Sequence, residues 1–331
     1  MIASEDFKAA IDTMRSKFKK DDDTFFILDD DYVKDIPVIS TGVIAVDSAL
    51  GVGGVPRGRI TEIYGPESSG KTTLSLKIIA ACHKEGGTAL FIDAEHAFDP
   101  SWAKKLGVDL SRLVIVQPNH GEEALEKVIT FVKEDIVDLI VVDSVPSLVP
   151  KEELEAEFEK IQVGLQARLM SKSLRKIANI LGKTKTAIIF INQVRVKIGG
   201  FARFGEPLDT PGGKALKFYA SVRMETRKKD VIKDDSGDIV GILTKVSIKK
   251  NKVAAPFKEA DFRINYEHGS DFINDMFDIG LEKGIIDKRG GWFYIDDHKA
   301  HGKDALITML TENEEIRGIL EEKLTGEEEE E

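Results

Sequence analysis

Hydrophobic residues follow two alternating patterns between residues 36 and 226. Short, continuous apolar runs alternate with longer stretches in which apolar residues recur every three or four positions. Strands covered on both faces are apolar at successive positions, so the short runs predict buried strands. We expect strands at 59–64, 88–94, 112–117, 137–143 and 186–192, and helices at 71–84, 121–134 and 162–182. This alternation predicts an α/β fold with a mostly parallel, twisted sheet.

Beyond residue 218 the pattern changes. Three further strands are expected, at 219–228, 242–250 and 261–266, with the turn-rich DDSGD (234–238) joining the first two. The final part combines a helical pattern, a Gly-Gly-Trp turn and an acidic end, which indicates a small, separate α/β domain. We therefore expect an N-terminal helix and linker at 1–35, a core at 36–268 and a C-terminal domain at 269–331.

A narrow apolar stripe marks the N-terminal segment. Its members lie four, three and four positions apart, on one face of a helix: Phe7, Ile11, Met14 and Phe18. The Asp-rich stretch 21–35 separates this helix from the core. The periodicity leaves two alternatives open, because the stripe could pack on its own core or on a neighbouring subunit.

Composition limits the class of protein. With 331 residues, 42% of them hydrophobic and 32% charged, the chain is typical of a globular protein of about two domains. No run approaches the ~18 apolar residues of a membrane helix and the first residues lack a signal-peptide core, so no membrane partner is expected. The single cysteine, Cys82, excludes an internal disulfide and favours a reducing, cytoplasmic setting. We assign Cys82 and the adjacent His83 to packing or surface.

The net charge of −11 argues against nucleic acid as a partner until its distribution is considered. Residues 312–331 have a net charge of −8 and residues 21–35 one of −6, which leaves +3 for the remainder. The stretch from Lys160 to Gly205 contains ten Lys/Arg and no acidic residue. Such a run is either a solvated face or a surface that binds a polyanion.

A phosphate-binding loop is the strongest local motif. The pattern G-x-x-x-x-G-K-[ST] is matched in full by Gly65, Pro66, Glu67, Ser68, Ser69, Gly70, Lys71 and Thr72. The motif lies between an expected strand and an expected helix, where its backbone N–H groups would face phosphates at the helix N-terminus. Lys71 would reach the β- and γ-phosphates and the Thr72 hydroxyl would bind Mg²⁺. The sequence therefore predicts a nucleoside triphosphate site.

Two carboxylates at strand ends complete this prediction. Asp143 ends the run LIVVD; alone it is equally a turn former, but beside a phosphate loop it becomes a candidate second Mg²⁺ ligand. The other carboxylate follows the expected strand 88–94, which comes earlier in the chain. Glu95 lies just beyond the apolar run of that strand, whereas Asp93 lies within it. We therefore interpret Glu95 as the base that orients water for attack on the γ-phosphate. His96 is interpreted as a structural histidine.

The last expected strand of this series ends at Asn192 and Gln193, where an amide could contact the γ-phosphate. The glycine-rich segment 194–213 follows, with the basic and aromatic residues Arg195, Lys197, Phe201, Arg203 and Phe204. Long loops without regular structure are usually functional or disordered. Basic residues interleaved with aromatic ones suit single-stranded nucleic acid, and surface disorder is the alternative.

At this point the motifs resemble one family, the bacterial-type RecA recombinases, bacterial or phage-encoded. The matching stretches are GPESSGKTT (65–73), FIDAEHAFDP (91–100), IVVDSV (140–145), FINQVRVKIG (190–199), GGKALKFYASVR (212–223) and KNKVAAPF (250–257). The resemblance implies a RecA-type P-loop ATPase core with an N-terminal helix and a small α/β C-terminal domain. It also implies a DNA-dependent ATPase that forms a helical filament on single-stranded DNA and catalyses strand exchange in recombinational repair.

The resemblance further assigns roles to matching positions. For the Mg-ATP site it implies the loop residues through Thr73, together with Trp102, Asp143 and Tyr266. Glu95 would be catalytic, Gln193 would couple the γ-phosphate to the DNA loop, and Lys250 and Lys252 would reach the ATP of the adjacent subunit. The N-terminal helix would pack on a neighbouring subunit, and a LexA-like repressor is a candidate partner.

The DNA contacts are implied in the same way. Two loops, Glu157–Gly164 and Val194–Thr210, would bind DNA, with Val163, Gly164, Arg168, Arg175, Arg195, Lys197, Arg203, Phe204, Gly212 and Gly213. The C-terminal domain would bind duplex DNA through Lys283, Lys288, Arg289 and Lys303, and the Glu-rich end would restrain that binding. The second loop departs from the family pattern by its extra Phe201, Arg203 and Pro211, and the first has Val163 in place of methionine.

One rival hypothesis uses the same fold. A regulatory or scaffolding ATPase would act on protein partners, and fold alone does not separate the two. The acid-free basic stretch and the pair Lys250 and Lys252 favour the recombinase.

Overall fold

The computed structural model describes residues 4–17, 36–157, 164–196, 208–234, 236–270 and 272–325. They form two compact units, Met1–Ile36 and Pro37–Glu331. In the first unit, α1 (Ser4–Lys17) has exposed Phe7 and Met14 side chains, while Phe18 of the expected stripe lies outside the described residues. The domain boundaries expected at 35 and 268 stay predictions.

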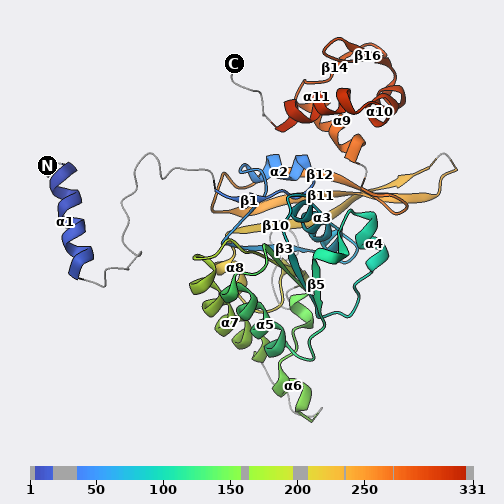
Figure 1. Cartoon of the computed structure of the whole chain (residues 1–331). Helices are drawn as coiled ribbons and strands as arrows, with labels where there is room; N and C mark the ends of the chain where they lie inside the picture. The colour runs from blue at the N-terminus through green and yellow to red at the C-terminus, as the bar shows by residue number, and fades with distance from the viewer. Residues whose placement is uncertain are drawn as a thin grey trace, which may run out of the picture. The chain divides into compact units, whose positions relative to one another are not determined.

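Within the described residues, a nine-stranded sheet organises the second unit (Figure 1). Its parallel strands are, in spatial order, β10 (Val222–Lys233), β3 (Ile60–Gly65), β7 (Ala187–Gln193), β6 (Leu139–Asp143), β4 (Ala89–Asp93) and β5 (Leu113–Val116). Antiparallel strands extend the β10 edge: β11 (Ile239–Asn251), β12 (Glu259–Asn265) and β13 (Gly269–Ser270). The predicted α/β fold with a mostly parallel sheet is confirmed.

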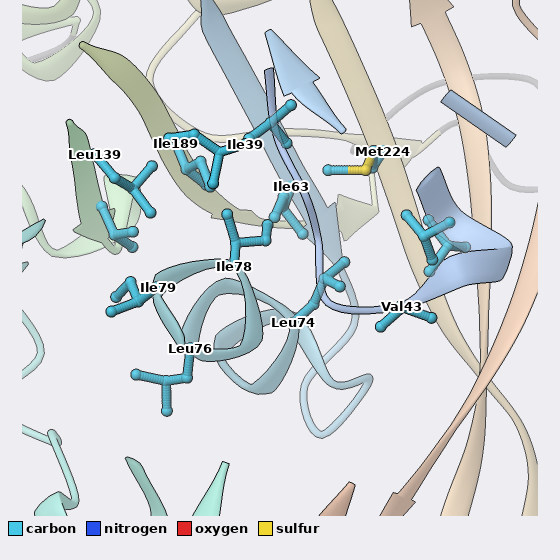
Figure 2. Close-up of a cluster of buried hydrophobic side chains, with 14 of the residues drawn as sticks. Ile39, Val43, Ile63, Leu74, Leu76, Ile78, Ile79, Leu139, Ile189 and Met224 are labelled. Carbon is cyan, nitrogen blue, oxygen red and sulfur yellow. The ribbon is translucent and has the colours of Figure 1, made fainter. Parts of the chain in front are cut away.

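Four of the five apolar runs are buried because helices cover both faces of the sheet. The expectation of a buried strand at 112–117 is wrong, because β5 is the edge strand and its Val114 and Ile115 side chains are 44% and 40% exposed. The helix α3 (Lys71–Lys84) packs on one face, where Leu74 and Ile78 meet Ile63 and Ile189 of the strands (Figure 2). On the other face pack α5 (Gly121–Glu134), α7 (Leu165–Leu181) and α8 (Ala215–Tyr219). The central strand β6 is buried along its full length, which explains its lack of alternation.

Shorter elements complete the core. They are β1 (Val38–Ile39), α2 (Ile44–Leu50), β2 (Val55–Pro56), α4 (Pro100–Lys105), η2 (Leu110–Arg112), η3 (Val145–Ser147), α6 (Lys151–Glu155), β8 (Arg195–Val196) and β9 (Leu208–Asp209). The strands β8 and β9 pair antiparallel with each other in a separate two-stranded sheet, on either side of residues 197–207. This pairing brings the two ends of that segment together.

The last part of the chain has its own apolar core, in which Phe277, Phe293 and Leu306 are buried. Its elements are α9 (Phe272–Glu282), β14 (Asp287–Arg289), β15 (Trp292–Ile295), β16 (His298–His301), α10 (Lys303–Glu312) and α11 (Glu314–Thr325). The three strands pair antiparallel, so the expected small α/β domain is confirmed. Nowhere in the described ranges is a helix both long and apolar enough to cross a membrane.

Candidate functional site

The phosphate-binding loop is shaped by close packing and by left-handed backbone. It connects β3 to α3, and Ser68 and Gly70 have φ values of 54° and 85°. A Cβ atom on Gly65 would lie 2.2 Å from the carbonyl oxygen of Thr226, so this position requires glycine. The Ser69 hydroxyl donates to the Pro66 carbonyl at 2.7 Å. The loop is thereby held against β10, with the N-terminus of α3 available to an anion.

Lys71, Thr72 and Asp143 meet at the mouth of this loop. Thr72 Oγ1 donates to Asp143 Oδ2 at 2.8 Å, and Lys71 Nζ donates to the Pro66 carbonyl at 2.6 Å. Burial raises the pKa of Asp143 to about 6, and the hydrogen bond from Thr72 opposes part of this rise. Burial lowers the pKa of Lys71, whereas the nearby carboxylates raise it. A hydroxyl and a carboxylate beside a phosphate cradle fit a Mg²⁺ ion that also binds phosphates.

Asp93 and Glu95 have different surroundings, as the sequence predicted. Asp93 is buried and accepts hydrogen bonds from the N–H groups of Ala97 and Phe98 and from Gln117 Nε2, at 3.0, 3.3 and 2.9 Å. These bonds fix the turn that follows β4. Glu95 is exposed at that turn, and Ser144 Oγ donates to its Oε1. Of these two carboxylates, only Glu95 is exposed. His96 is exposed, with a left-handed φ of 56°.

Gln193 lies directly beside the phosphate loop, because β7 and β3 are neighbours and Gln193 pairs with Gly65. The preceding Asn192, the other amide at this strand end, is fully buried. Its Nδ2 donates to Glu62 Oε1 at 2.9 Å and to the Pro211 carbonyl at 3.2 Å. Asn192 therefore fixes the end of β7 to the residues that precede Gly212.

The other nucleotide candidates lie on separate elements. Trp102 of α4 donates its indole N–H to Thr73 Oγ1 at 3.4 Å, so these two predicted residues are brought together. Tyr266, after β12, is half exposed. Lys250 Nζ donates to the carbonyls of Lys217 and Phe218, at 2.7 and 3.1 Å, and so binds the C-terminal end of α8. Lys252 is exposed just beyond β11.

Several predicted DNA contacts lie on or beside α7. Arg168 and Arg175 share an exposed, basic face of this helix with Lys172 and Lys176. Gly164 begins this helix with a φ of 82°, and Arg195 is exposed on β8. The remaining loop candidates lie outside the described residues: Val163, Lys197, Arg203 and Phe204.

The predicted glycine pair is required by close packing. A Cβ atom on Gly212 would lie 2.7 Å from Val145 Cγ1, and one on Gly213 would lie 2.9 Å from Ala167 Cβ. Both residues have left-handed φ values, 83° and 77°. The chain after residue 211 therefore rests directly on η3 and α7.

The four basic candidates of the C-terminal domain all have partners within it. Lys283 donates to the Leu324 carbonyl at 3.0 Å, and Lys303 contacts Asp278 at 3.2 Å. Arg289 pairs with Asp287 at 2.7 Å, and Lys288 lies over the Phe293 ring at 5.5 Å. Their predicted contacts with duplex DNA are not tested by this arrangement.

The fold and the phosphate loop define the class: a P-loop nucleotide-binding protein with a RecA-like α/β core. Family comparison is more specific, because the RecA N-terminal domain matches residues 5–271 and the RecA C-terminal domain matches residues 274–327. The chain belongs to the RecA family. The resemblance noted from the motifs is thereby confirmed.

Individual relatives support the same family assignment. The chain is 50% identical over 293 residues to Protein RecA of Thioalkalivibrio sulfidiphilus, covering 88% of this chain and 84% of that one. It is also 50% identical over 316 residues to Protein RecA of Chlorobaculum parvum, covering 95% and 90%. Among solved structures, that of the RadB recombinase aligns with a TM-score of 0.52 at 24% identity, over 70% of this chain and 98% of that one. The last match shows the fold alone.

Proposed function

We propose that the chain is an ATP-dependent DNA recombinase, which forms a filament on single-stranded DNA and exchanges strands with a homologous duplex. The observation behind this is the match to both RecA domains over nearly the whole chain, with an intact phosphate loop in which burial lowers the pKa of Lys71 and Glu95, among other carboxylates, opposes that shift. Relatives at 50% identity are named Protein RecA. ATP hydrolysis releases the filament from DNA.

The described residues support a direct route for that hydrolysis. The loop's N–H groups and Lys71 bind the triphosphate, with Trp102 next to Thr73 as the adenine contact and Tyr266 as a second. Thr72 and Asp143 would hold Mg²⁺, which neutralises phosphate charge. Water attacks the γ-phosphorus in line, Glu95 accepts the water proton, and the bond to the bridging β–γ oxygen breaks, giving ADP and phosphate.

DNA binding is proposed to follow from the chain segments next to this site. Gln193, beside Gly65, contacts the γ-phosphate and leads into residues 194–213. The basic face of α7 and Arg195 bind the phosphate backbone, which is the main source of affinity for single strands. The ordering of Gln193 by ATP thereby favours DNA binding.

Filament assembly is proposed to use surfaces that a single chain leaves exposed. Phe7 and Met14 of α1 are 48% and 46% exposed, as expected of a contact with another subunit. In such a head-to-tail contact Lys250 and Lys252 would reach the neighbour's ATP. A LexA-like repressor remains a predicted partner of the filament.

Phosphate release with and without single-stranded DNA tests this proposal, together with electron microscopy in a slowly hydrolysed ATP analogue. We expect turnover to depend on DNA and helical filaments to form on it. Closed rings with DNA-independent turnover would support the rival regulatory ATPase and contradict the recombinase.

A further inference from the structure

The chain segment 144–148, directly after the candidate Mg²⁺ ligand Asp143, touches the candidate base. Ser144 Oγ donates to Glu95 Oε1. Ser144 is only 1% exposed, whereas Glu95 is exposed, so this hydroxyl fixes the carboxylate from the protein side. This hydrogen bond links the position of Ser144 to the orientation of the Glu95 carboxylate.

The same segment is held by the start of α7. Gln166 Nε2 donates to the carbonyls of Val145, Pro146 and Leu148, at 2.9, 3.1 and 3.4 Å. Val145 and Leu148 are fully buried, so their carbonyls depend on a protein donor. Gln166 lies two residues after Gly164, where the first proposed DNA-binding loop ends.

The residues that follow the second proposed DNA-binding loop pack on this segment as well. The backbone of Gly212 lies so close to Val145 that an added Cβ would stand 2.7 Å from Val145 Cγ1. The same added Cβ would stand 3.4 Å from Cγ of Met170 in α7. Two parts of the chain that adjoin proposed DNA contacts therefore converge on residues 145–148, whose covalent neighbour Ser144 binds Glu95.

We propose that Ser144 is a positioning residue that couples DNA binding to ATP turnover. Gln166 and Gly212 set the position of residues 145–148, and Ser144 sets the orientation of the Glu95 carboxylate to match. A base displaced by ~1 Å loses about 100-fold in rate, so a small shift of this segment suffices to change turnover. The inference rests on the proposed function, because it assigns the regulation of the same ATP site.

Steady-state ATPase kinetics of Ser144→Ala, with and without single-stranded DNA, test the inference. We expect kcat with DNA to fall about tenfold and kcat without DNA to fall less than threefold, with KM for ATP within twofold of the parent. Ser144→Thr keeps the hydroxyl and should recover at least half of the DNA-stimulated kcat. Ser147→Ala is the matched control, because it removes a hydroxyl from the same segment and leaves the Ser144–Glu95 hydrogen bond intact.

A second variant tests the hydrogen bonds from Gln166 to the segment 145–148. Gln166→Leu keeps a side chain of similar size and removes the donors to the three carbonyls, so it should reduce the ratio of turnover with DNA to turnover without it. DNA affinity is measured in parallel by a fluorescence-anisotropy titration, and turnover is then compared at a DNA concentration that saturates each variant. If Ser144→Ala does not fold, Gln166→Leu decides the question.

Two results would overturn the inference. Equal losses of kcat with and without DNA would show that Ser144 has only a structural role. A rise of the DNA-free turnover to the DNA-stimulated rate would show that Ser144 restrains Glu95 instead of positioning it. A parent protein without DNA-stimulated turnover would instead contradict the proposed function itself.

Discussion

At the scale of single residues, the surroundings of a side chain decide between neighbours of the same chemistry. Asp93 and Glu95 are two positions apart, but the carboxylate oxygens of Asp93 accept hydrogen bonds. Their donors are the N–H groups of Ala97 and Phe98 and the side chain of Gln117. Glu95 keeps an oxygen beyond the one that Ser144 contacts. This difference supports Glu95, rather than Asp93, as the proposed base.

Glu95→Gln tests this assignment. The amide keeps the size of the side chain but is not a base, and general bases contribute 10²- to 10⁴-fold. We expect turnover with DNA to fall at least about 100-fold while the Kd for ATP changes by less than about threefold. Phosphate release and a fluorescent ATP analogue measure the two quantities, with Glu126→Gln, exposed on α5, as control. Retention of more than a tenth of the turnover would exclude Glu95 as the base.

Gly212→Ala tests the close contact with Val145. The new methyl group adds a clash at 2.7 Å to the cost of a left-handed φ of 83°, which is about 1–2 kcal/mol for a non-glycine residue. Gly237→Ala is the control, because residue 237 has a similar φ of 89° but no heavy atom lies within 4 Å of the added Cβ. We expect urea unfolding to show a larger loss of stability for Gly212→Ala, by at least about 1 kcal/mol. Equal losses would show that the contact with Val145 is unimportant.

At the scale of elements, α2 shows how a polar group sets the entry to the core. Asp47 accepts hydrogen bonds from Ser40 Oγ and from the Thr41 N–H, at 2.6 and 2.8 Å, and so fixes the chain between β1 and α2. Burial raises the pKa of Asp47 to about 6, although these hydrogen bonds and Lys77 oppose the rise.

A raised pKa makes stability depend on pH. The folded state keeps the Asp47 proton up to about pH 6, while the unfolded chain releases it near pH 4, so the free energy of unfolding should fall as pH rises between these values. One pKa unit corresponds to about 1.4 kcal/mol, and this partly buried group should contribute roughly 2 kcal/mol. Asp47→Asn should remove that fall in urea unfolding at pH 4.5 and 7, and exposed Asp238→Asn should not. An identical pH dependence in the parent and Asp47→Asn would contradict the pKa.

The elements themselves were largely predictable, because strands covered on both faces leave an unbroken apolar run. The expected strand 186–192 is β7 at Ala187–Gln193, and the expected helix 71–84 is α3. The same runs indicated which residues end the strands, such as Asp143 and Gln193, and their proposed roles in the site stay predictions. Contacts that depend on the order of strands were not: Ser144 meets Glu95 across 49 positions, and Asn192 meets Glu62 across 130. Periodicity contains no information on which strands become neighbours.

At the scale of the whole molecule, the net charge of −11 is a sum over regions of opposite sign. The exposed face of α7 is basic, whereas the last six residues, 326–331, include five glutamates and lie outside the described residues. Like charge near a duplex weakens binding, and salt screens the effect. The acidic balance is therefore compatible with a DNA-binding protein.

Deletion of residues 325–331 tests the predicted restraint. We expect the shortened chain to bind duplex DNA more tightly at low salt, with the difference shrinking as salt approaches ~1 M, where screening acts within about 3 Å. Fluorescence anisotropy across a salt titration measures it, and a chain with the five glutamates replaced by glutamine separates charge from length. Equal affinity of parent and deletion at every salt concentration would contradict the restraint.

The central claim, that this chain is an ATP-dependent DNA recombinase, is tested most directly by strand exchange. Single-stranded DNA is incubated with the protein and a labelled duplex, homologous or unrelated in sequence, with and without ATP. We predict displacement of the labelled strand only from the homologous duplex, only with ATP, and not with Lys71→Ala, which lacks the phosphate-binding amine. Protein that binds ATP and single-stranded DNA but displaces no strand from the homologous duplex would contradict the claim.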